Sequence, residues 1–301
     1  MPAKRLRECP ALLASAALLA SGHLAVAQSL FTQITEGPHV TDLGHSGFGG
    51  WADYDNDGYA DLSVERYEGD AEMDTLYRNN GDGSFAEVTE ETIVTERPLN
   101  NGWSYQVAWF DYNNDGFLDA YVMNGDDNES IITANQLFRN NGNENAWLTV
   151  RPVGTVSNRD GIGAKVRMLA TYAGTARWQR RDIAGGDTNN GNDRYAHFGL
   201  GDATNVTTLR IDWPSGTVQE LTNVATKQIL TITEPAKLVP LGAGEFQIRC
   251  WKGMQFEVQK SVNLQTWALL GVVTNATGTL VFHDAQPDPG AACCFYRVVS
   301  R

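Results

Sequence analysis

Basic residues, helical periodicity and long apolar runs are all scarce in this chain of 301 residues. Residues 28–127 carry 21 acidic but only 3 basic side chains, a net charge of -18, so this region should repel nucleic acid and anionic membranes. No stretch after residue 27 is apolar enough to span a bilayer. Because apolar residues alternate or occur in short pieces, without a helical period, we expect an all-β protein.

The first 27 residues have the composition of a secretory signal. Three basic residues precede an apolar run over residues 11–20, and Ala25-Val26-Ala27 provides a small-x-small cleavage site. We therefore predict cleavage after Ala27 and a secreted or cell-surface protein with no remaining membrane span. Polar residues interrupt the run, so a retained membrane anchor is the less favoured alternative.

Cysteine is also rare. Of the four in the chain, Cys9 would leave with the signal, whereas Cys250, Cys293 and Cys294 would remain. An exported protein folds in an oxidising compartment, where thiols tend to pair. The expected disulfide joins Cys250 to either Cys293 or Cys294 and leaves one thiol over. The alternative is that all three stay unpaired and act as small apolar residues.

A segment of the acidic region occurs twice. WADYDNDGYAD at residues 51–61 recurs as WFDYNNDGFLD at residues 109–119, and LYRNNG at 76–81 recurs as LFRNNG at 137–142. Short β-rich pieces flank both copies, at residues 62–64, 75–77, 120–122 and 136–138. A repeat of about 60 residues with several short strands predicts blade-like, four-stranded sheets.

The composition changes at Trp147, where acidic and basic residues become balanced. Further strands are expected at residues 147–150, 164–168, 208–213 and 228–232, then after a proline-containing linker at 256–258, 267–270, 280–282 and 295–299. The expected organisation is a signal peptide over residues 1–27, two repeats over 28–146, a second β domain over 147–236 and a small β module over 237–301.

Each repeat places oxygen-bearing side chains at alternate positions of a tight loop. Positions 1, 3, 5 and 9 are Asp53, Asp55, Asp57 and Asp61 in the first loop, and Asp111, Asn113, Asp115 and Asp119 in the second. Ca²⁺ takes about six to eight oxygen ligands. Glycine at position 6 permits a sharp turn that lets the carbonyl of Tyr59 or Phe117 join them. Zinc prefers His or Cys, which these loops lack, so the sequence predicts Ca²⁺. Aspartate-rich turns without a metal are the alternative.

These motifs resemble known families. Both loops, with the aromatic residue before them and the strand after them, are similar to the FG-GAP or VCBS repeats that form blades of integrin-type β-propellers. GIGAKV at 161–166, HFGLG at 197–201 and IDWPSG at 211–216 resemble the ASPIC/UnbV domain of cartilage acidic protein-like proteins. NLQTW at 263–267 and FYRV at 295–298 are more distantly similar to fibronectin-like tails.

The resemblance implies a fold with three parts. FG-GAP/VCBS blades would form a partial β-propeller, followed by a β-sandwich-like ASPIC/UnbV domain and a small C-terminal β module. Two blades cannot close a ring, so their edge strands must be covered. Self-association and shielding by the second domain are two ways to cover them, and a reduced relative of the family is the third alternative.

A catalytic constellation does not emerge from the sequence. We expect His197, in a glycine-rich β motif, to be structural. The basic group of Arg177, Arg180 and Arg181 is either a solvated face or a surface for an acidic partner.

The expected function is therefore that of an exported, calcium-binding module that binds extracellular protein or carbohydrate, as in adhesion. The alternative is a secreted polysaccharide-active lyase or hydrolase on a calcium-stabilised β scaffold, with its acid and base among the aspartates.

Overall fold

The computed structural model describes residues 30–66, 73–96, 103–125, 133–185, 194–242, 244–285 and 294–300. The predicted signal peptide lies outside these residues. The chain divides into two units, Met1–Thr35 and Glu36–Arg301. Residues 30–35 of the first unit contain no helix or strand. In the described part of the chain, no helix is long and apolar enough to cross a membrane.

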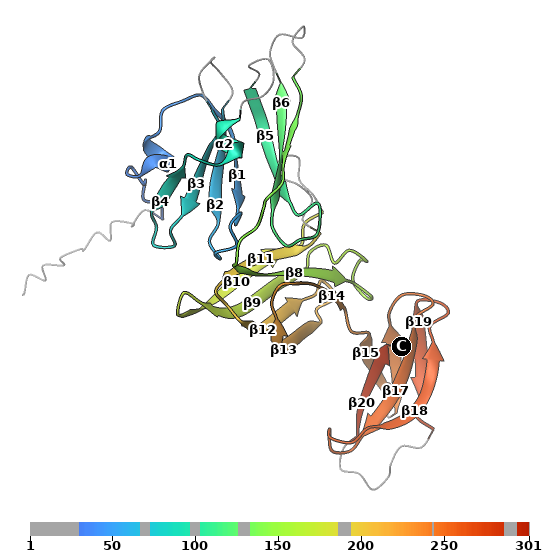
Figure 1. Cartoon of the computed structure of the whole chain (residues 1–301). Coiled ribbons are helices and arrows are strands. Elements are labelled where there is room, and N and C mark those ends of the chain that lie inside the picture. Colours follow the sequence, from blue (N-terminus) through green and yellow to red (C-terminus); the bar gives the residue numbers. More distant parts are fainter. Residues whose placement is uncertain are drawn as a thin grey trace, which may run out of the picture. The chain divides into compact units, whose positions relative to one another are not determined.

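The first repeat forms the predicted four-stranded antiparallel blade. Its strands are β1 (Ser46–Ala52), β2 (Asp61–Arg66), β3 (Thr75–Asn79) and β4 (Phe85–Val88), in that spatial order (Figure 1). The one-turn helix α1 (Pro38–Thr41) precedes the sheet, and a second, α2 (Thr92–Thr95), follows it. Over the first five residues of β2, buried polar side chains alternate with half-buried Leu62 and Val64, as in a strand with one face covered more than the other.

The second repeat contributes three strands to its sheet among the described residues: β5 (Trp103–Phe110), β6 (Asp119–Gly125) and β7 (Gln136–Phe138). The prediction of a second four-stranded blade was wrong. The segment that corresponds to β4 in the sequence is β8 (Ala146–Val153), which pairs with strands of the next domain. Its first five residues are all buried, a pattern that suits a central strand better than a blade edge.

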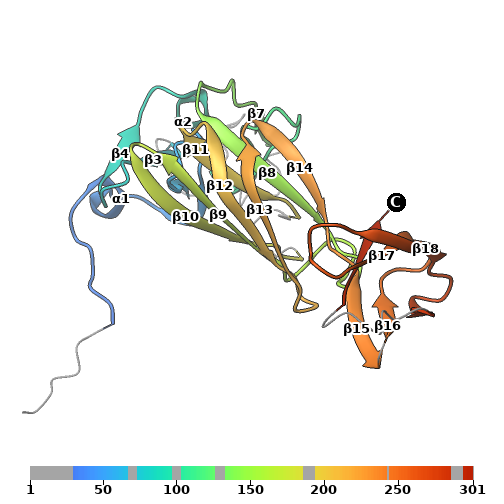
Figure 2. The ribbon, with the colours of Figure 1, turned by 90° about the horizontal axis from the view of Figure 1, so that it is seen from below.

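The second β domain is a sandwich of two sheets. One sheet has the order β10 (Thr175–Asp182), β9 (Lys165–Tyr172), β12 (Asn205–Asp212) and β13 (Val218–Ala225), and these strands run side by side in Figure 2. The other has the order β11 (Ala196–Gly201), β8 and β14 (Gln228–Thr233), with β14 parallel to β8. Fully buried Leu148, Phe198 and Leu209 belong to its single hydrophobic core. The expected β-sandwich is therefore confirmed.

The C-terminal module also consists of two small sheets. They are β15 (Lys237–Gly242), β16 (Glu245–Arg249) and β19 (Thr279–His283), and β18 (Ala268–Thr274), β17 (Gln255–Ser261) and β20 (Phe295–Ser300). Ile248, Phe256 and Val258 form the centre of a core that both sheets contribute to.

Among the described residues, the predicted pairing of Cys250 with Cys294 is absent. Cys250 and Cys294 are both free thiols, and Cys293 lies outside the described residues. Cys250 is 5% exposed and belongs to the hydrophobic core. Its sulfur accepts a hydrogen bond from Nδ2 of Asn275 at 3.0 Å. Cys250 therefore acts as a small buried core residue, as the alternative expected of each of the three cysteines.

A buried carboxylate closes the second domain. Glu234 is 1% exposed, and its Oε2 accepts hydrogen bonds from the amides of Thr155, Val156 and Ser157 at 2.8, 2.9 and 2.7 Å. The hydroxyl of Ser157 donates to Oε1 at 2.9 Å. Burial alone would raise the pKa of Glu234, but hydrogen bonds from Ser215 and from these amides outweigh it and lower the pKa.

We expect Glu234→Gln to destabilise the protein by roughly 1 to 3 kcal/mol, because an amide NH₂ cannot accept from the buried donors. Denaturant unfolding measures the effect, and Glu220→Gln, at a half-exposed position on β13, is the matched control. A lowered pKa means that the carboxylate stabilises the fold above its unfolded-state pKa. The difference between wild type and variant should therefore shrink as the pH falls below about 4.3. A difference that grows in acid would contradict this account.

Candidate metal centre

The two acidic loops have the same backbone conformation. The first connects β1 to β2 and the second connects β5 to β6. Asn56 and Asn114, at position 4, have φ angles of 59° and 60°, whereas Gly58 and Gly116, at position 6, have angles of 94° and 90°. Asn tolerates the left-handed region and Gly adopts it freely, so these residues permit the same tight turn in both copies.

The aspartate at position 1 caps the turn from inside. The amide of Gly58 donates to Oδ2 of Asp53 at 3.1 Å, and the amide of Gly116 donates to Oδ2 of Asp111 at 2.8 Å. The carboxylates therefore face into their loops, as the prediction of a metal site requires.

The aspartate at position 9 joins each loop to the next strand. Asp61 accepts from the amide of Tyr54 at 3.2 Å through Oδ2 and from the amide of Asn79 at 2.8 Å through Oδ1. Asp119 accepts the two equivalent bonds at 3.1 and 2.8 Å. Both residues are 1% exposed, so a conserved geometry holds a buried carboxylate at the base of each loop.

Only in the first loop do carboxylates converge closely. Asp53, Asp55 and Asp61 each offer an oxygen within 4.8 Å of the others, and among the described residues this is the one group of three or more acidic, His or Cys side chains that does so. Asp57 lies outside the group, and its Oδ1 accepts from the amide of Tyr59 at 2.9 Å. Participation of the Tyr59 and Phe117 carbonyls stays a prediction.

The first loop also suits a cation because one of its buried carboxylate oxygens has no hydrogen-bond partner. Asp53 is 3% exposed, and its Oδ1 is buried without a hydrogen-bond partner. A buried carboxylate oxygen without a donor is costly, and a hard cation such as Ca²⁺ is a partner that prefers oxygen ligands. Asp53, Asp55 and Asp61 would hold the ion and so neutralise their mutual repulsion.

The pKa values reflect the same crowding. Burial, followed by repulsion from Asp57 and Asp55, raises the pKa of Asp53 to about 8. Burial is also the main cause that raises the pKa of Asp61 to about 8 and that of Asp57 to about 7. The charged loop is therefore unfavourable without a counter-ion at neutral pH.

The second loop satisfies itself to a greater extent. Oδ1 of Asp111 accepts from the amide of Asp115 at 3.1 Å, so it has the partner that Asp53 lacks. Nδ2 of Asn113 donates to Oδ2 of Asp115 at 2.7 Å, and both of these side chains are exposed. The second loop therefore has less need of a cation than the first.

Asn56, which the sequence arguments did not single out, fixes the first loop in place. It is fully buried, and its Nδ2 donates to the carbonyl of Gly116 in the second loop at 2.9 Å. Its carbonyl accepts from the amide of Gly201 at 2.8 Å, and its Oδ1 lies 2.8 Å from Nε2 of His197. An asparagine at position 4 of both loops was the available signal, but its partners are distant in the sequence.

His197 is structural, as predicted. Its Nδ1 lies 3.0 Å from the hydroxyl of Thr149 and its Nε2 faces Asn56, so both ring nitrogens have partners. Burial, together with the nearby guanidinium of Arg181, lowers the pKa of His197 to about 3, which keeps the ring neutral. The ring therefore links Thr149 of β8 to Asn56 of the first loop.

The basic residues of β10 divide between its two faces. The guanidinium of Arg177 lies over the ring of Tyr59, 4.9 Å from its centroid, and that of Arg181 lowers the pKa of Asp53. Arg180 instead pairs with exposed Asp182. Arg177 and Arg181 therefore face the first loop of the same chain, where Arg177 meets an aromatic ring and Arg181 a carboxylate, whereas Arg180 lies on the solvated face.

Comparison with protein families agrees with this geometry. A family described as FG-GAP-like repeat matches residues 53–122, which begin at position 1 of the first loop and include the whole second loop. A second family, described as ASPIC and UnbV, matches residues 154–239. The chain is an FG-GAP repeat protein with an ASPIC/UnbV domain. Strand β8 lies before the ASPIC/UnbV match but pairs within that domain's sheet.

Two solved structures are distantly similar to the chain. A tetra-tandem repeat from the extending region of a large adhesion protein is 12% identical to this FG-GAP repeat protein, with 86% of this chain and 70% of that chain covered and a TM-score of 0.17. A streptococcal ancillary pilin is 9% identical, with 80% and 77% covered and a TM-score of 0.18. TM-scores this low give no support for a shared fold. A search among curated proteins finds no match.

We expect Gly199→Ala, in β11 of the ASPIC/UnbV domain, to displace the first FG-GAP loop. The added methyl carbon would lie 2.0 Å from Oδ2 of Asp53 and 2.6 Å from Cα of Asn56. The resulting overpacking should reduce the free energy of unfolding by about 1 to 3 kcal/mol in denaturant titrations. Gly185→Ala is the control, because its methyl group would meet only Ile162, at 3.7 Å. Equal effects of the two substitutions would mean that this close approach does not matter.

Proposed function

We propose that this FG-GAP repeat protein is an exported, calcium-stabilised module that binds extracellular protein or carbohydrate. The observation that carries the calcium part is the unpartnered, buried Oδ1 of Asp53 within the triad of Asp53, Asp55 and Asp61. The ion would contribute charge neutralisation and rigidity to the loop and need not contact the ligand.

Export is supported by the sequence features of residues 1–27. Outside the cell, calcium is plentiful, and loops with dissociation constants of about 10⁻⁴ to 10⁻³ M would be filled. The unfavourable pKa values of the first loop would thereby be relieved where the protein works. A secreted or cell-surface location and a calcium site thus support each other.

A binding role is favoured over a polysaccharide-active enzyme by the state of the candidate groups. His197 has partners on both ring nitrogens and a lowered pKa, and the carboxylates of the first loop are directed inward at one another. Although both Asp53 and His197 line a pocket of ≈ 300 Å³, their polar atoms are directed at groups of the protein. Turnover of a polysaccharide by the purified protein would reverse this preference.

Self-association remains a prediction that follows from the incomplete ring. Of the four edge strands of the two repeat sheets, β1 and β5 contact each other, and the other two, β4 and β7, have four and three residues. Short edges offer few unpaired backbone groups, so any pairing between copies through them would be weak. Light scattering across a concentration series would detect it.

Calcium should raise the melting midpoint of chelated protein by a few degrees. A tenfold excess of ion over its dissociation constant adds about 1.4 kcal/mol per site, which corresponds to roughly 3 to 6 °C for a domain of this size. Asp53→Asn should remove most of the calcium-dependent shift, because Asp53 holds the unpartnered oxygen of the triad.

The matched control is Asp111→Asn, at the same position of the second loop. It should leave most of the shift in place, because Asp111 already receives two amide donors within its own loop. Scanning calorimetry of both variants, with chelator and with calcium, measures the difference. A melting midpoint that is the same with chelator and with calcium would overturn the calcium proposal. A larger loss of the calcium-dependent shift in Asp111→Asn than in Asp53→Asn would place the site in the second loop.

A further inference from the structure

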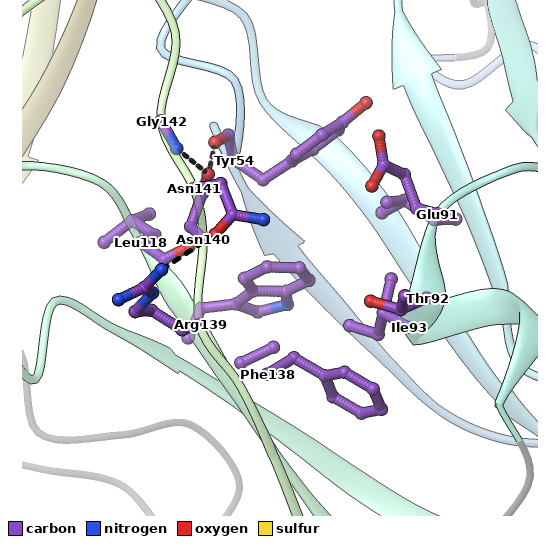
Figure 3. A pocket seen from close by; sticks show the side chains of 13 residues that line it. Tyr54, Glu91, Thr92, Ile93, Leu118, Phe138, Arg139, Asn140, Asn141 and Gly142 are labelled. Carbon is purple, nitrogen blue, oxygen red and sulfur yellow. Dashed lines mark hydrogen bonds between the residues drawn. The ribbon is translucent and has the colours of Figure 1, made fainter.

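A pocket of ≈ 250 Å³ lies between the two repeats, and we call it the interblade pocket. Tyr54 comes from the first loop, Glu91 and Ile93 from the segment around α2, Trp109 from β5, and Arg139 and Asn141 from the segment after β7. Figure 3 shows Glu91 and Thr92 on one side of it and Arg139, Asn140 and Asn141 on the other. Drug-sized ligands fill about 300 to 1,000 Å³, so this pocket suits a single ring.

Two aromatic side chains form a wall of the pocket. The rings of Tyr54 and Trp109 have centroids 6.4 Å apart and planes inclined by 35°. Trp109 donates from Nε1 to the hydroxyl of Ser63 at 3.4 Å, which fixes its orientation, and buried Leu76 also lines the pocket. The electron-rich faces of such rings attract the polarised C–H groups of a pyranose.

The polar groups at the rim of the pocket suit a ligand that carries hydroxyl groups better than a charged ligand. Glu91 is exposed and only accepts hydrogen bonds when ionised, whereas exposed Arg139 only donates. Arg139 donates from Nη2 to Oδ1 of Asn141 at 3.1 Å, which leaves the amide nitrogen of Asn141 as a further donor at the rim. One carboxylate and one guanidinium balance in charge, so the pocket favours a neutral ligand whose groups both donate and accept.

The position of the pocket depends on both acidic loops. The amide of Tyr54 donates to Asp61 of the first loop at 3.2 Å. The backbone carbonyl of Tyr54 accepts a hydrogen bond from Nδ2 of Asn140 at 2.8 Å. The backbone amide of Asn140 in turn donates to Asp119 of the second loop at 2.8 Å. An ion that orders the loops would therefore order the pocket without touching its ligand.

We infer that the interblade pocket binds one pyranose ring of a neutral carbohydrate, stacked on Tyr54 and Trp109 and held through its hydroxyls by Glu91, Arg139 and Asn141. This inference rests on the proposed function, which it narrows to carbohydrate. Calcium strengthens the binding indirectly, through the loops that hold Tyr54 and Asn140.

The probes are the methyl glycosides of glucose, galactose, mannose and N-acetylglucosamine, titrated calorimetrically into the full chain with calcium and with chelator. At least one should bind with a dissociation constant on the order of 1 mM, as expected for a single ring. Chelator should weaken this binding. Absence of binding for all four glycosides overturns the inference, and equal binding in chelator overturns its dependence on calcium.

Matched variants locate the site. Trp109→Ala should abolish binding, whereas Trp51→Ala, at the equivalent position of the first repeat and outside the pocket, should preserve it. Because Trp109 also packs on a small core, Glu91→Gln is a second test that spares the fold. It should weaken binding by about tenfold through loss of a charge-assisted hydrogen bond, and Glu90→Gln should not.

The outcomes separate this inference from the proposed function. A calcium-dependent melting shift without glycoside binding overturns the inference of a carbohydrate site but supports the proposed calcium-stabilised module. Glycoside binding without any calcium-dependent melting shift supports the carbohydrate site but overturns the proposal that calcium stabilises the protein. Binding that survives both Trp109→Ala and Glu91→Gln, or that Trp51→Ala removes equally, places the carbohydrate elsewhere and overturns the inference.

Discussion

The candidate cation site and the contacts between the repeats and the next domain both depend on aspartates that are buried beneath a neighbouring strand. Asp53 and Asp61 are almost completely inaccessible, and the closest approach to Asp53 is made possible by a glycine in β11. Water is therefore replaced by protein around charges that repel one another. The fold supplies amide donors and the nearby Arg181, yet one oxygen of Asp53 remains without a hydrogen-bond partner. This deficit makes the first loop the better candidate for a cation site, although both loops have the same sequence spacing.

The same burial connects the repeats to the ASPIC/UnbV domain. Asn56 hydrogen-bonds to the second loop through Gly116 and to β11 through His197 and Gly201, while Arg177 of β10 stacks over Tyr59. Unpaired polar groups in such a contact would be costly, so the partners must be in place together. The loop thus serves as a joint between the two repeats and the following domain, in addition to its role as a candidate ion site.

Strand β8 shows how the chain passes from one architecture to the next. By its place in the repeat it corresponds to β4, but its five buried leading residues fit the centre of a sheet, between antiparallel β11 and parallel β14. The second repeat therefore keeps three strands in its sheet among the described residues. Continuous burial on both faces outweighed the sequence repeat, because a central strand removes more apolar surface from water than a blade edge does.

The sequence by itself determined the all-β class, the positions of most strands, the two families and the shared geometry of the acidic loops, because each depends on local periodicity and on residues within one turn. It did not reveal that Asn56 meets His197, that Asp57 lies outside the converging triad or that Cys250 is a core residue with a free thiol. Only the tertiary structure decided which of two nearly identical loops is more deeply buried. That choice depends on the strand packed against each loop, and contacts between residues 141 positions apart have no local signature.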